Sequence, residues 1–216
     1  MHTMWLLHEI QNTNKKCQVS NWKVVNMIET YSELLKYVKK YNVISDKHRK
    51  IVIDQDSNLK WRKHTWSDYD KKIEGESSNT EFDRAPVNSI AHLVLNSYID
   101  ACINNYVNSF NSTPHSFLFN GYTAPNINKY EEGTKMRSHV DHIYTCFDGT
   151  VKGIPILSVV GLLNDDFNGG EFLFWDNTVY ELKAGDIMIF PSNFMYPHSV
   201  NTVTSGSRIS FVSWVY

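Results

Sequence analysis

The chain has 216 residues, of which 42% are hydrophobic and 13% aromatic, and its formal net charge is −2 at pH 7. This length suits one domain with a substantial core, and the composition is typical of a globular protein. The near-neutral charge excludes a general attraction to nucleic acid or to an acidic membrane surface, and no stretch approaches the ~18 apolar residues of a membrane span.

The cysteines and the first residues indicate the compartment. Cys17, Cys102 and Cys146 are scattered and odd in number, without a C-x-x-C pair. This pattern favours reduced thiols over a disulfide framework, so we expect a cytoplasmic protein. The first residues lack a basic start followed by a long apolar run, so no signal peptide is expected. We expect neither a nucleic-acid nor a membrane partner.

The first part of the chain, residues 1–115, is expected to be a helical and irregular support. Apolar residues recur at helical spacing over residues 27–41, and a stronger helix begins at Pro86, with an apolar stripe that would pack on a sheet. Residues 51–53 predict a short strand. The charged stretch 68–83 predicts a loop, which is either a cover over the site or a plain solvated connection.

The pattern changes from helical to extended for the remaining residues, 116–216. Asp176-Asn177, between two expected strands, predicts a tight hairpin. Many short strands without intervening helices favour a mainly β fold with supporting helices, either a barrel or a jelly roll. We therefore expect a single domain over residues 1–216. The expected strands cover residues 117–122, 137–147, 154–163, 172–175, 179–182, 187–190 and 207–215.

Three residues are candidates for a metal site. His139 and Asp141 are two apart, so both side chains would face the same way on an extended strand, whereas a helix would splay them by roughly 200°. His198 is the candidate third ligand, and alternation turns His142 to the opposite face from Asp141. Two imidazoles and one carboxylate that leave open positions are typical of non-haem Fe(II) oxygenases. A lone H-x-D is common by chance, so the prediction depends on the order and context of all three.

An arginine follows the third candidate ligand at ten residues' distance. Arg208 is always charged and directs a fork of donors toward a carboxylate, which makes it the expected anchor for a dicarboxylate co-substrate. Ser210, two residues further along an expected strand, faces the same way and could add a hydroxyl.

The chain from about residue 117 to its end resembles the prolyl 4-hydroxylase-type 2-oxoglutarate and Fe(II)-dependent dioxygenases. Besides the residues above, the likeness rests on Tyr-Glu-Glu-Gly at residues 130–133, on Leu-Asn-x-x-Phe-x-Gly-Gly-Glu within residues 162–172, and on residues 184–192. One departure is Met136, where the family often has a tyrosine. Trp214 stands where related nucleic-acid demethylases carry a second arginine, which argues against that branch.

The resemblance implies a double-stranded β-helix, or jelly roll, with N-terminal helical segments packed on one sheet. It implies Fe(II), 2-oxoglutarate and O2 as cofactors, with ascorbate in support. Tyr130 would then hydrogen-bond the distal carboxylate of 2-oxoglutarate, and Arg208 would pair with it. The implied reaction is prolyl 4-hydroxylation in a peptide or protein, with release of succinate and CO2.

The sequence also suggests residues that would contact the substrate. Arg137, Tyr144 and Trp175 are expected at the mouth of the site, where aromatic walls suit a proline ring; each aromatic could instead be ordinary core, and Trp214 is expected in the core. Three alternatives remain open. They are a hydroxylase of a free amino acid or other small molecule, a catalytically silent β-barrel that acts as a binding module, and a cupin-type enzyme with another metal and no 2-oxoglutarate.

Overall fold

The computed structural model describes residues 27–55, 58–67, 72–73, 80–110, 119–142 and 154–216. The chain divides into two units, Met1–Lys36 and Tyr37–Tyr216. Within the first unit, helix α2 (Met27–Leu35) is shorter than the helix expected over residues 27–41. The last part of that stretch, including Lys39 and Lys40, is a strand of the second unit instead.

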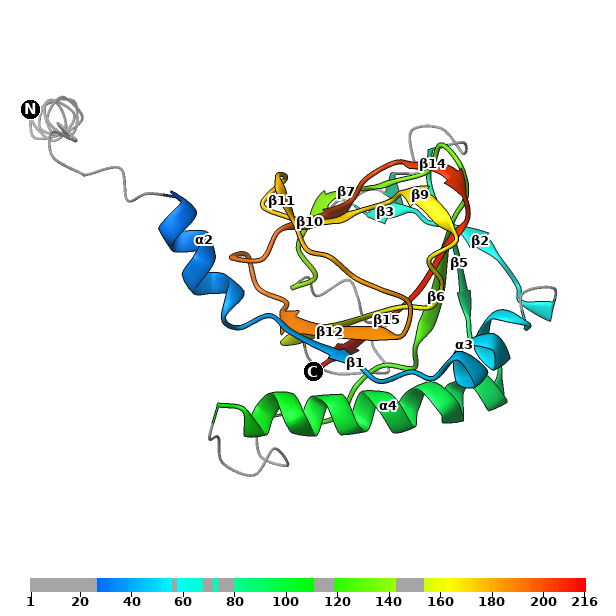
Figure 1. The fold of residues 1–216 in the computed structure, drawn as a ribbon, viewed down its shortest axis with the longest axis horizontal. Coiled ribbons are helices and arrows are strands. Elements are labelled where there is room, and N and C mark those ends of the chain that lie inside the picture. Colours follow the sequence, from blue (N-terminus) through cyan, green and yellow to red (C-terminus); the bar gives the residue numbers. More distant parts are fainter. Residues whose placement is uncertain (1–26, 56–57, 68–71, 74–79, 111–118, 143–153) are drawn as a thin grey trace, which may run out of the picture. The chain divides into compact units, whose positions relative to one another are not determined.

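The second unit, Tyr37–Tyr216, is built on two antiparallel sheets that form the walls of a jelly roll (Figure 1). The larger sheet has the strand order β1-β12-β8-β15-β6-β5-β2, and the smaller sheet has the order β11-β10-β13-β7. This confirms the expected mainly β fold.

The larger sheet contains β1 (Lys39–Asn42), β2 (Arg62–Lys63), β5 (Asp83–Pro86), β6 (Asn126–Tyr130), β8 (Leu157–Leu162), β12 (Asp186–Pro191) and β15 (Arg208–Val215). The smaller sheet contains β7 (Met136–His139), β10 (Phe172–Phe174), β11 (Thr178–Val179) and β13 (His198–Val200). Two further ladders pair β3 (Trp66–Ser67) with β4 (Lys72–Ile73) and β9 (Phe167–Gly169) with β14 (Val203–Gly206).

Helices α3 (Asp46–Ile53) and α4 (Ser89–Asn108) support the larger sheet, and α4 runs along its outer face (Figure 1). Each begins at a polar N-cap, because the side chain of Ser45 accepts the His48 N–H and that of Asn88 accepts the Ala91 N–H. The strand expected at residues 51–53 was wrong, since these residues form the last turn of α3. Pro86 is the last residue of β5 and precedes α4 rather than starting it.

The apolar stripe of α4 packs on the larger sheet, as the sequence predicts. The packed core joins fully buried residues of α4 with residues of β6, β8, β12 and β15. Burial of each large aliphatic side chain contributes roughly 1.5–3 kcal/mol, so this layer anchors the sheet that carries one wall of the site. The core members named here are Leu95, Ile99, Ile103, Ile127, Val159, Ile187 and Phe211.

Several strands were not predicted. β1, β2 and β5 come from the part expected to be helical and irregular, yet they extend both edges of the larger sheet. β6, β13 and β14 were also missed because they are short and have no clean alternation. The strand expected over residues 137–147 ends at His139, and residues 143–147 lie outside the described part of the chain. Most of the stretch 68–83 also lies outside it, so its role as a cover stays a prediction.

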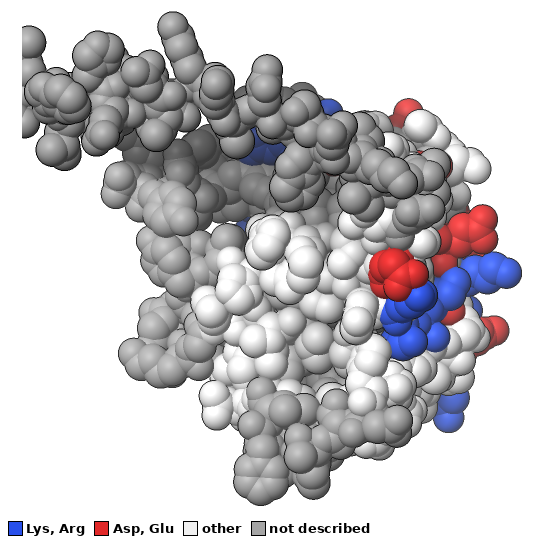
Figure 2. Space-filling model, turned by 90° about the vertical axis from the view of Figure 1, so that its left-hand side faces the viewer, with Lys and Arg blue, Asp and Glu red and all other residues white. Residues whose placement is uncertain are grey.

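The charges on the described surface are mixed. On the face drawn in Figure 2, acidic and basic side chains gather together at one edge, and most of the remaining described surface there is uncharged. In the part of the chain that the structure describes, no helix has the length and apolar character needed to cross a membrane.

Candidate metal centre and co-substrate pocket

His139, Asp141 and His198 converge on one point. His139 ends β7 and is the direct cross-strand partner of His198, which begins β13. Asp141 lies two residues beyond β7; its Oδ1 is 3.4 Å from His139 Nε2 and its Oδ2 is 3.7 Å from His198 Nε2. The three donor atoms all lie within 4.8 Å of one another, so one metal ion could contact them all.

The backbone orients both imidazole rings. The Nδ1–H of His139 donates to the carbonyl oxygen of Arg137 at 2.8 Å, and the Nδ1–H of His198 donates to that of Tyr196 at 3.1 Å. Each bond keeps a proton on Nδ1, so Nε2, the ring nitrogen that faces Asp141, is the one available to a metal ion. A second acceptor that fixes the tautomer in this way is a general feature of metal-binding histidines.

The carboxylate of Asp141 is buried and held by a serine pair. Ser158 donates its hydroxyl to Asp141 Oδ2 at 2.6 Å, and its own oxygen lies 2.8 Å from the hydroxyl of Ser192. Burial opposes ionisation, but the charge that His198 carries at low pH and the hydrogen bonds from His139 and Ser158 outweigh it and hold the pKa of Asp141 well below its usual range. Asp141 is therefore an anion ready to bind a cation.

The two histidines respond differently to the same surroundings. Burial lowers the pKa of His198 to about 4, so this ring is neutral, the form that binds metals. Burial also acts to lower the pKa of His139, but the hydrogen bond and charge of Asp141 outweigh it and raise that pKa above its usual value. The anionic carboxylate thus favours a positive charge beside it, which a metal ion would supply in place of a proton.

Arg208 lines the same cavity as the three candidate ligands and is only 2% exposed. Its Nη1 donates to Ser210 Oγ at 2.9 Å, and its guanidinium carbon lies 5.2 Å from the centre of the Tyr130 ring. No carboxylate of the described residues forms an ion pair with it. A buried guanidinium of this kind fits the carboxylate of a dicarboxylate ligand.

Burial raises the pKa of Tyr130 to about 12, so its hydroxyl keeps its proton and can donate it to an anion beside Arg208. The Oδ1 of Asn128, which lines the same cavity, is buried without a hydrogen-bond partner among the described residues. Asn128 lies on β6 directly opposite Ser210. These groups form a polar pocket around the guanidinium.

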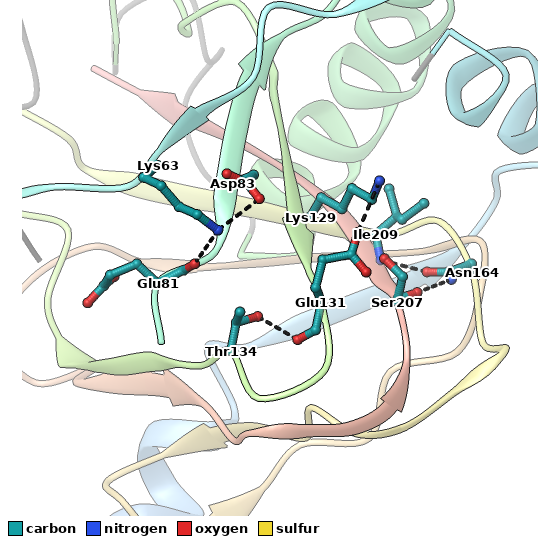
Figure 3. A network of polar contacts seen from close by, with 9 residues as sticks. All are labelled: Lys63, Glu81, Asp83, Lys129, Glu131, Thr134, Asn164, Ser207 and Ile209. Atoms are coloured by element: carbon teal, nitrogen blue, oxygen red, sulfur yellow. Dashed lines mark hydrogen bonds and ion pairs between the residues drawn. The ribbon is translucent and has the colours of Figure 1, made fainter. Parts of the chain in front are cut away.

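Asn164 fixes the backbone on both sides of Arg208. Its Oδ1 accepts the Ile209 N–H at 2.7 Å, and its Nδ2 donates to the Ser207 carbonyl at 2.6 Å (Figure 3). Gly170 packs against the side chain of Arg208, and a Cβ at this position would lie only 2.9 Å from Arg208 Cδ. These contacts explain why Asn and Gly occur in the segment 162–172.

The cavity has a volume of ≈ 240 Å³, and more residues line it than the sequence analysis expected. Met136, which replaces the family's frequent tyrosine, lines it, and so does Trp214, which was expected in the core. Other lining residues that the sequence analysis missed are His64, Trp66, Phe82, Arg84 and Asn128.

Trp66 covers the metal site from β3. Its ring meets the His139 ring edge-on at 5.5 Å between centres, and the Arg137 guanidinium stacks on it at 4.4 Å. The buried carboxylate of Glu81 holds Trp66 in place by accepting its indole N–H at 3.0 Å, and also lies 3.4 Å from His64 Nδ1. No spacing in the sequence relates these residues, because they meet only through the tertiary fold.

The three expected substrate residues differ in position. Arg137 does not line the cavity but stacks on Trp66, which does. Trp175 is 9% exposed, donates its indole N–H to the Met195 carbonyl at 2.8 Å and packs beside Phe174, outside the cavity. Tyr144 lies outside the described residues.

A jelly roll that brings two histidines, one carboxylate and a buried arginine into one cavity defines a class: the non-haem iron proteins that bind a dicarboxylate co-substrate. The donor set fits Fe(II), and the pocket around Arg208 fits 2-oxoglutarate. Comparison with known families supports this class. Residues 125–216 match the model of the 2OG-Fe(II) oxygenase superfamily.

This match spans less than half of the chain, and over these residues the chain is similar to the 2OG-Fe(II) oxygenase superfamily. It is 35% identical over 95 residues to a PKHD-type hydroxylase of Idiomarina loihiensis, a match that covers 41% of this chain and 40% of the relative. A PKHD-type hydroxylase of Paraburkholderia phytofirmans is 34% identical over 103 residues, or 45% of this chain and 44% of the relative. The chain thus matches less than half the length of these relatives.

Solved structures share the fold at low sequence identity. A Pseudomonas putida prolyl-4-hydroxylase superposes with a TM-score of 0.59 at 15% identity, covering 88% of this chain and 98% of the other. A prolyl hydroxylase of Trichoplax adhaerens, in complex with a hypoxia inducible factor oxygen degradation domain peptide fragment, gives a TM-score of 0.59 at 16% identity, with 92% and 94% coverage. The expected double-stranded β-helix is therefore confirmed.

Proposed function

We propose that the protein is an Fe(II)- and 2-oxoglutarate-dependent hydroxylase of prolyl residues in a peptide or protein. The observation that carries the proposal is the presence, in one cavity, of the His139, Asp141 and His198 cluster and the buried guanidinium of Arg208. The prolyl substrate is supported by the likeness to prolyl hydroxylases of the same fold.

His139, Asp141 and His198 would hold Fe(II), and Arg208, Tyr130 and Ser210 would bind the distal carboxylate of 2-oxoglutarate. Bound Fe(II) supplies the redox chemistry that couples decarboxylation of 2-oxoglutarate, with O2, to hydroxylation of the substrate. The chain itself orients the two imidazoles through the Arg137 and Tyr196 carbonyls and keeps Asp141 ionised through Ser158. It also surrounds the site with aromatic walls that limit access of water.

The substrate residue would lie against Trp66 and Trp214. Both line the cavity, and flat aromatic surfaces suit a proline ring. Arg84 lines both this cavity and an adjoining groove, and that continuity favours a peptide over a free amino acid. A supporting role of ascorbate, a cytoplasmic location and a single domain over residues 1–216 stay predictions from the sequence.

The test is an assay of succinate with Fe(II), ascorbate, 2-oxoglutarate and a library of proline-containing peptides. We expect succinate release to accompany a mass gain of one oxygen on a peptide. Asp141→Ala should abolish both while the far-ultraviolet circular dichroism is retained. Full activity in that variant would refute the metal assignment, and a mass gain only on free amino acids would refute the peptide substrate.

A further inference from the structure

A second groove adjoins the cavity along β2 and β5. It has a volume of ≈ 400 Å³ and shares His64, Thr65 and Arg84 with the cavity that contains the metal cluster. A bound chain could therefore pass from one into the other without leaving the protein surface. The groove is lined by Lys60, Arg62, Lys63, His64, Thr65, Arg84, Ala85, Pro86 and Asn126.

The described residues that line this groove include several basic ones and no aspartate or glutamate, and we refer to it as the basic groove. Arg62 and Arg84 are direct partners in the β2–β5 ladder. Like charges opposite one another repel, so an anionic group that binds beside Arg62 would be favoured there. On the face drawn in Figure 2, by contrast, acidic and basic side chains mix at one edge.

The cations of the basic groove are held in two ways. Lys63 Nζ lies 3.0 Å from Asp83 Oδ2 and donates to the Glu81 carbonyl at 3.1 Å, so its charge is partly balanced (Figure 3). Arg84 stacks on the Trp214 ring at 5.0 Å and so joins the groove to the aromatic wall of the cavity. Arg62 and Lys60 are exposed and form no ion pair with another described residue.

We propose that the basic groove binds carboxylate side chains of a peptide substrate, on one side of the residue that enters the cavity. This inference rests on the proposed function and makes the substrate an acidic proline-containing peptide. Its charge is complementary to the groove, and the shared lining residues give the continuity that a single chain needs. The groove accommodates a few side chains and is too local for the long basic stripe that a nucleic-acid backbone requires.

The test measures binding, which does not depend on turnover. The full chain is loaded with Fe(II) and 2-oxoglutarate without oxygen, and fluorescein-labelled Glu-Glu-Pro-Glu-Glu and Gln-Gln-Pro-Gln-Gln are titrated by anisotropy. We expect the glutamate peptide to bind about tenfold more tightly at 20 mM salt, because several ion pairs add their small contributions. The difference should nearly vanish at 1 M salt, where screening acts within about 3 Å.

The test variant is Lys60→Glu/Arg62→Glu, which should abolish the preference for the glutamate peptide. Its matched control is Lys47→Glu/Lys50→Glu, which changes the net charge equally through two exposed lysines of α3 that line neither cavity, and should keep the preference. Equal binding of both peptides, equal loss in both variants, or tighter binding of an oligouridylate than of the glutamate peptide would overturn the inference.

Succinate release with the library of proline-containing peptides in the presence of oxygen, measured in parallel, separates this inference from the proposed function. Succinate with no glutamate preference would remove only the basic groove's role. A glutamate preference without succinate would support the groove and refute the hydroxylase.

Discussion

Arg208 and Tyr130 lie directly opposite one another in the β15–β6 ladder, and both side chains are 2% exposed. Burial lowers the pKa of Arg208, which means that the protein carries the cost of desolvating this cation. A structure that held a guanidinium here for stability alone would be expected to give it a carboxylate partner. The arrangement is instead suited to a ligand that brings the carboxylate.

Arg208→Met should therefore have opposite effects on stability and on ligand binding. We expect the ligand-free protein to gain about 1–4 kcal/mol in the free energy of unfolding, because a buried unpaired charge is replaced by an apolar chain. The Kd for 2-oxoglutarate should rise by about 30-fold or more, since loss of a buried charge pair costs about 2–5 kcal/mol. Thermal unfolding with and without 2-oxoglutarate measures both.

Ser210→Ala is the control for that experiment. It removes only the hydroxyl that accepts from Arg208 Nη1, so we expect a loss of about 1 kcal/mol in 2-oxoglutarate binding. If Arg208→Met destabilised the protein and left 2-oxoglutarate binding intact, Arg208 would be a structural residue.

Asn164 should act on 2-oxoglutarate without touching it. Asn164→Ala removes two hydrogen bonds that flank Arg208, so the guanidinium loses its fixed position. We expect the KM for 2-oxoglutarate to rise about fivefold to tenfold, with a small change in kcat at saturation. Asn164→Asp retains the acceptor for the Ile209 N–H and should recover part of the loss. An unchanged KM in Asn164→Ala would show that these two hydrogen bonds are not needed to position Arg208.

Trp66 and Trp175 allow a direct test of which tryptophan meets the substrate. Trp66→Phe shortens the aromatic wall of the cavity, so the KM for a peptide substrate should rise about threefold to tenfold. Trp175→Phe breaks the bond to the Met195 carbonyl and should cost about 1 kcal/mol of stability with no change in that KM. Steady-state kinetics and urea unfolding of both variants provide the measurements, and the reverse pattern would return Trp175 to the site.

His64 should make stability depend on pH. Burial, the largest effect, lowers its pKa to about 4, whereas the unfolded chain titrates near 6.5. Between these values the unfolded state binds the proton more readily, so stability is complete above pH 6.5 and is lost as the pH falls toward 4. From pH 7.5 to pH 5 the loss due to His64 should be about 2 kcal/mol.

Urea unfolding of wild type and His64→Gln at the two pH values isolates this contribution. His198 adds a pH dependence of stability with the same sign, and His139, whose pKa is raised, adds one with the opposite sign. Both histidines are present in wild type and in His64→Gln, so their contributions cancel in the comparison. An identical pH slope in wild type and His64→Gln would contradict the buried neutral state of His64.

The candidate ligands could be found from the sequence because their order and local patterns are specific. His139 and Asp141 were expected on one strand, but β7 ends at His139 and Asp141 follows in an irregular segment. The side chains nevertheless converge, because the β7–β13 pairing brings His139 to His198 and the Ser158 hydrogen bond holds the carboxylate of Asp141. Helix α4 was also found, because its apolar stripe repeats over many turns.

Short edge strands were missed because two to four residues carry no reliable period. β2 and β5 are examples, and they supply Arg62, Lys63, Arg84, Ala85 and Pro86 of the basic groove. Trp214 was expected in the core and Trp175 at the mouth, but Trp214 lines the cavity and Trp175 does not. Alternation along a strand does not tell which face of a jelly-roll sheet lines a cavity.

The amino-acid order alone determined which functional groups are available: two imidazoles, one carboxylate and one guanidinium, in a chain that forms mainly antiparallel strands. Only the tertiary structure decided what surrounds them, because Trp66, Glu81, Asn164 and Trp214 act through pairings between distant strands. Local patterns record which face of its own strand a side chain occupies. Its neighbours depend on how the sheets close on each other, and that closure is a property of the whole folded chain.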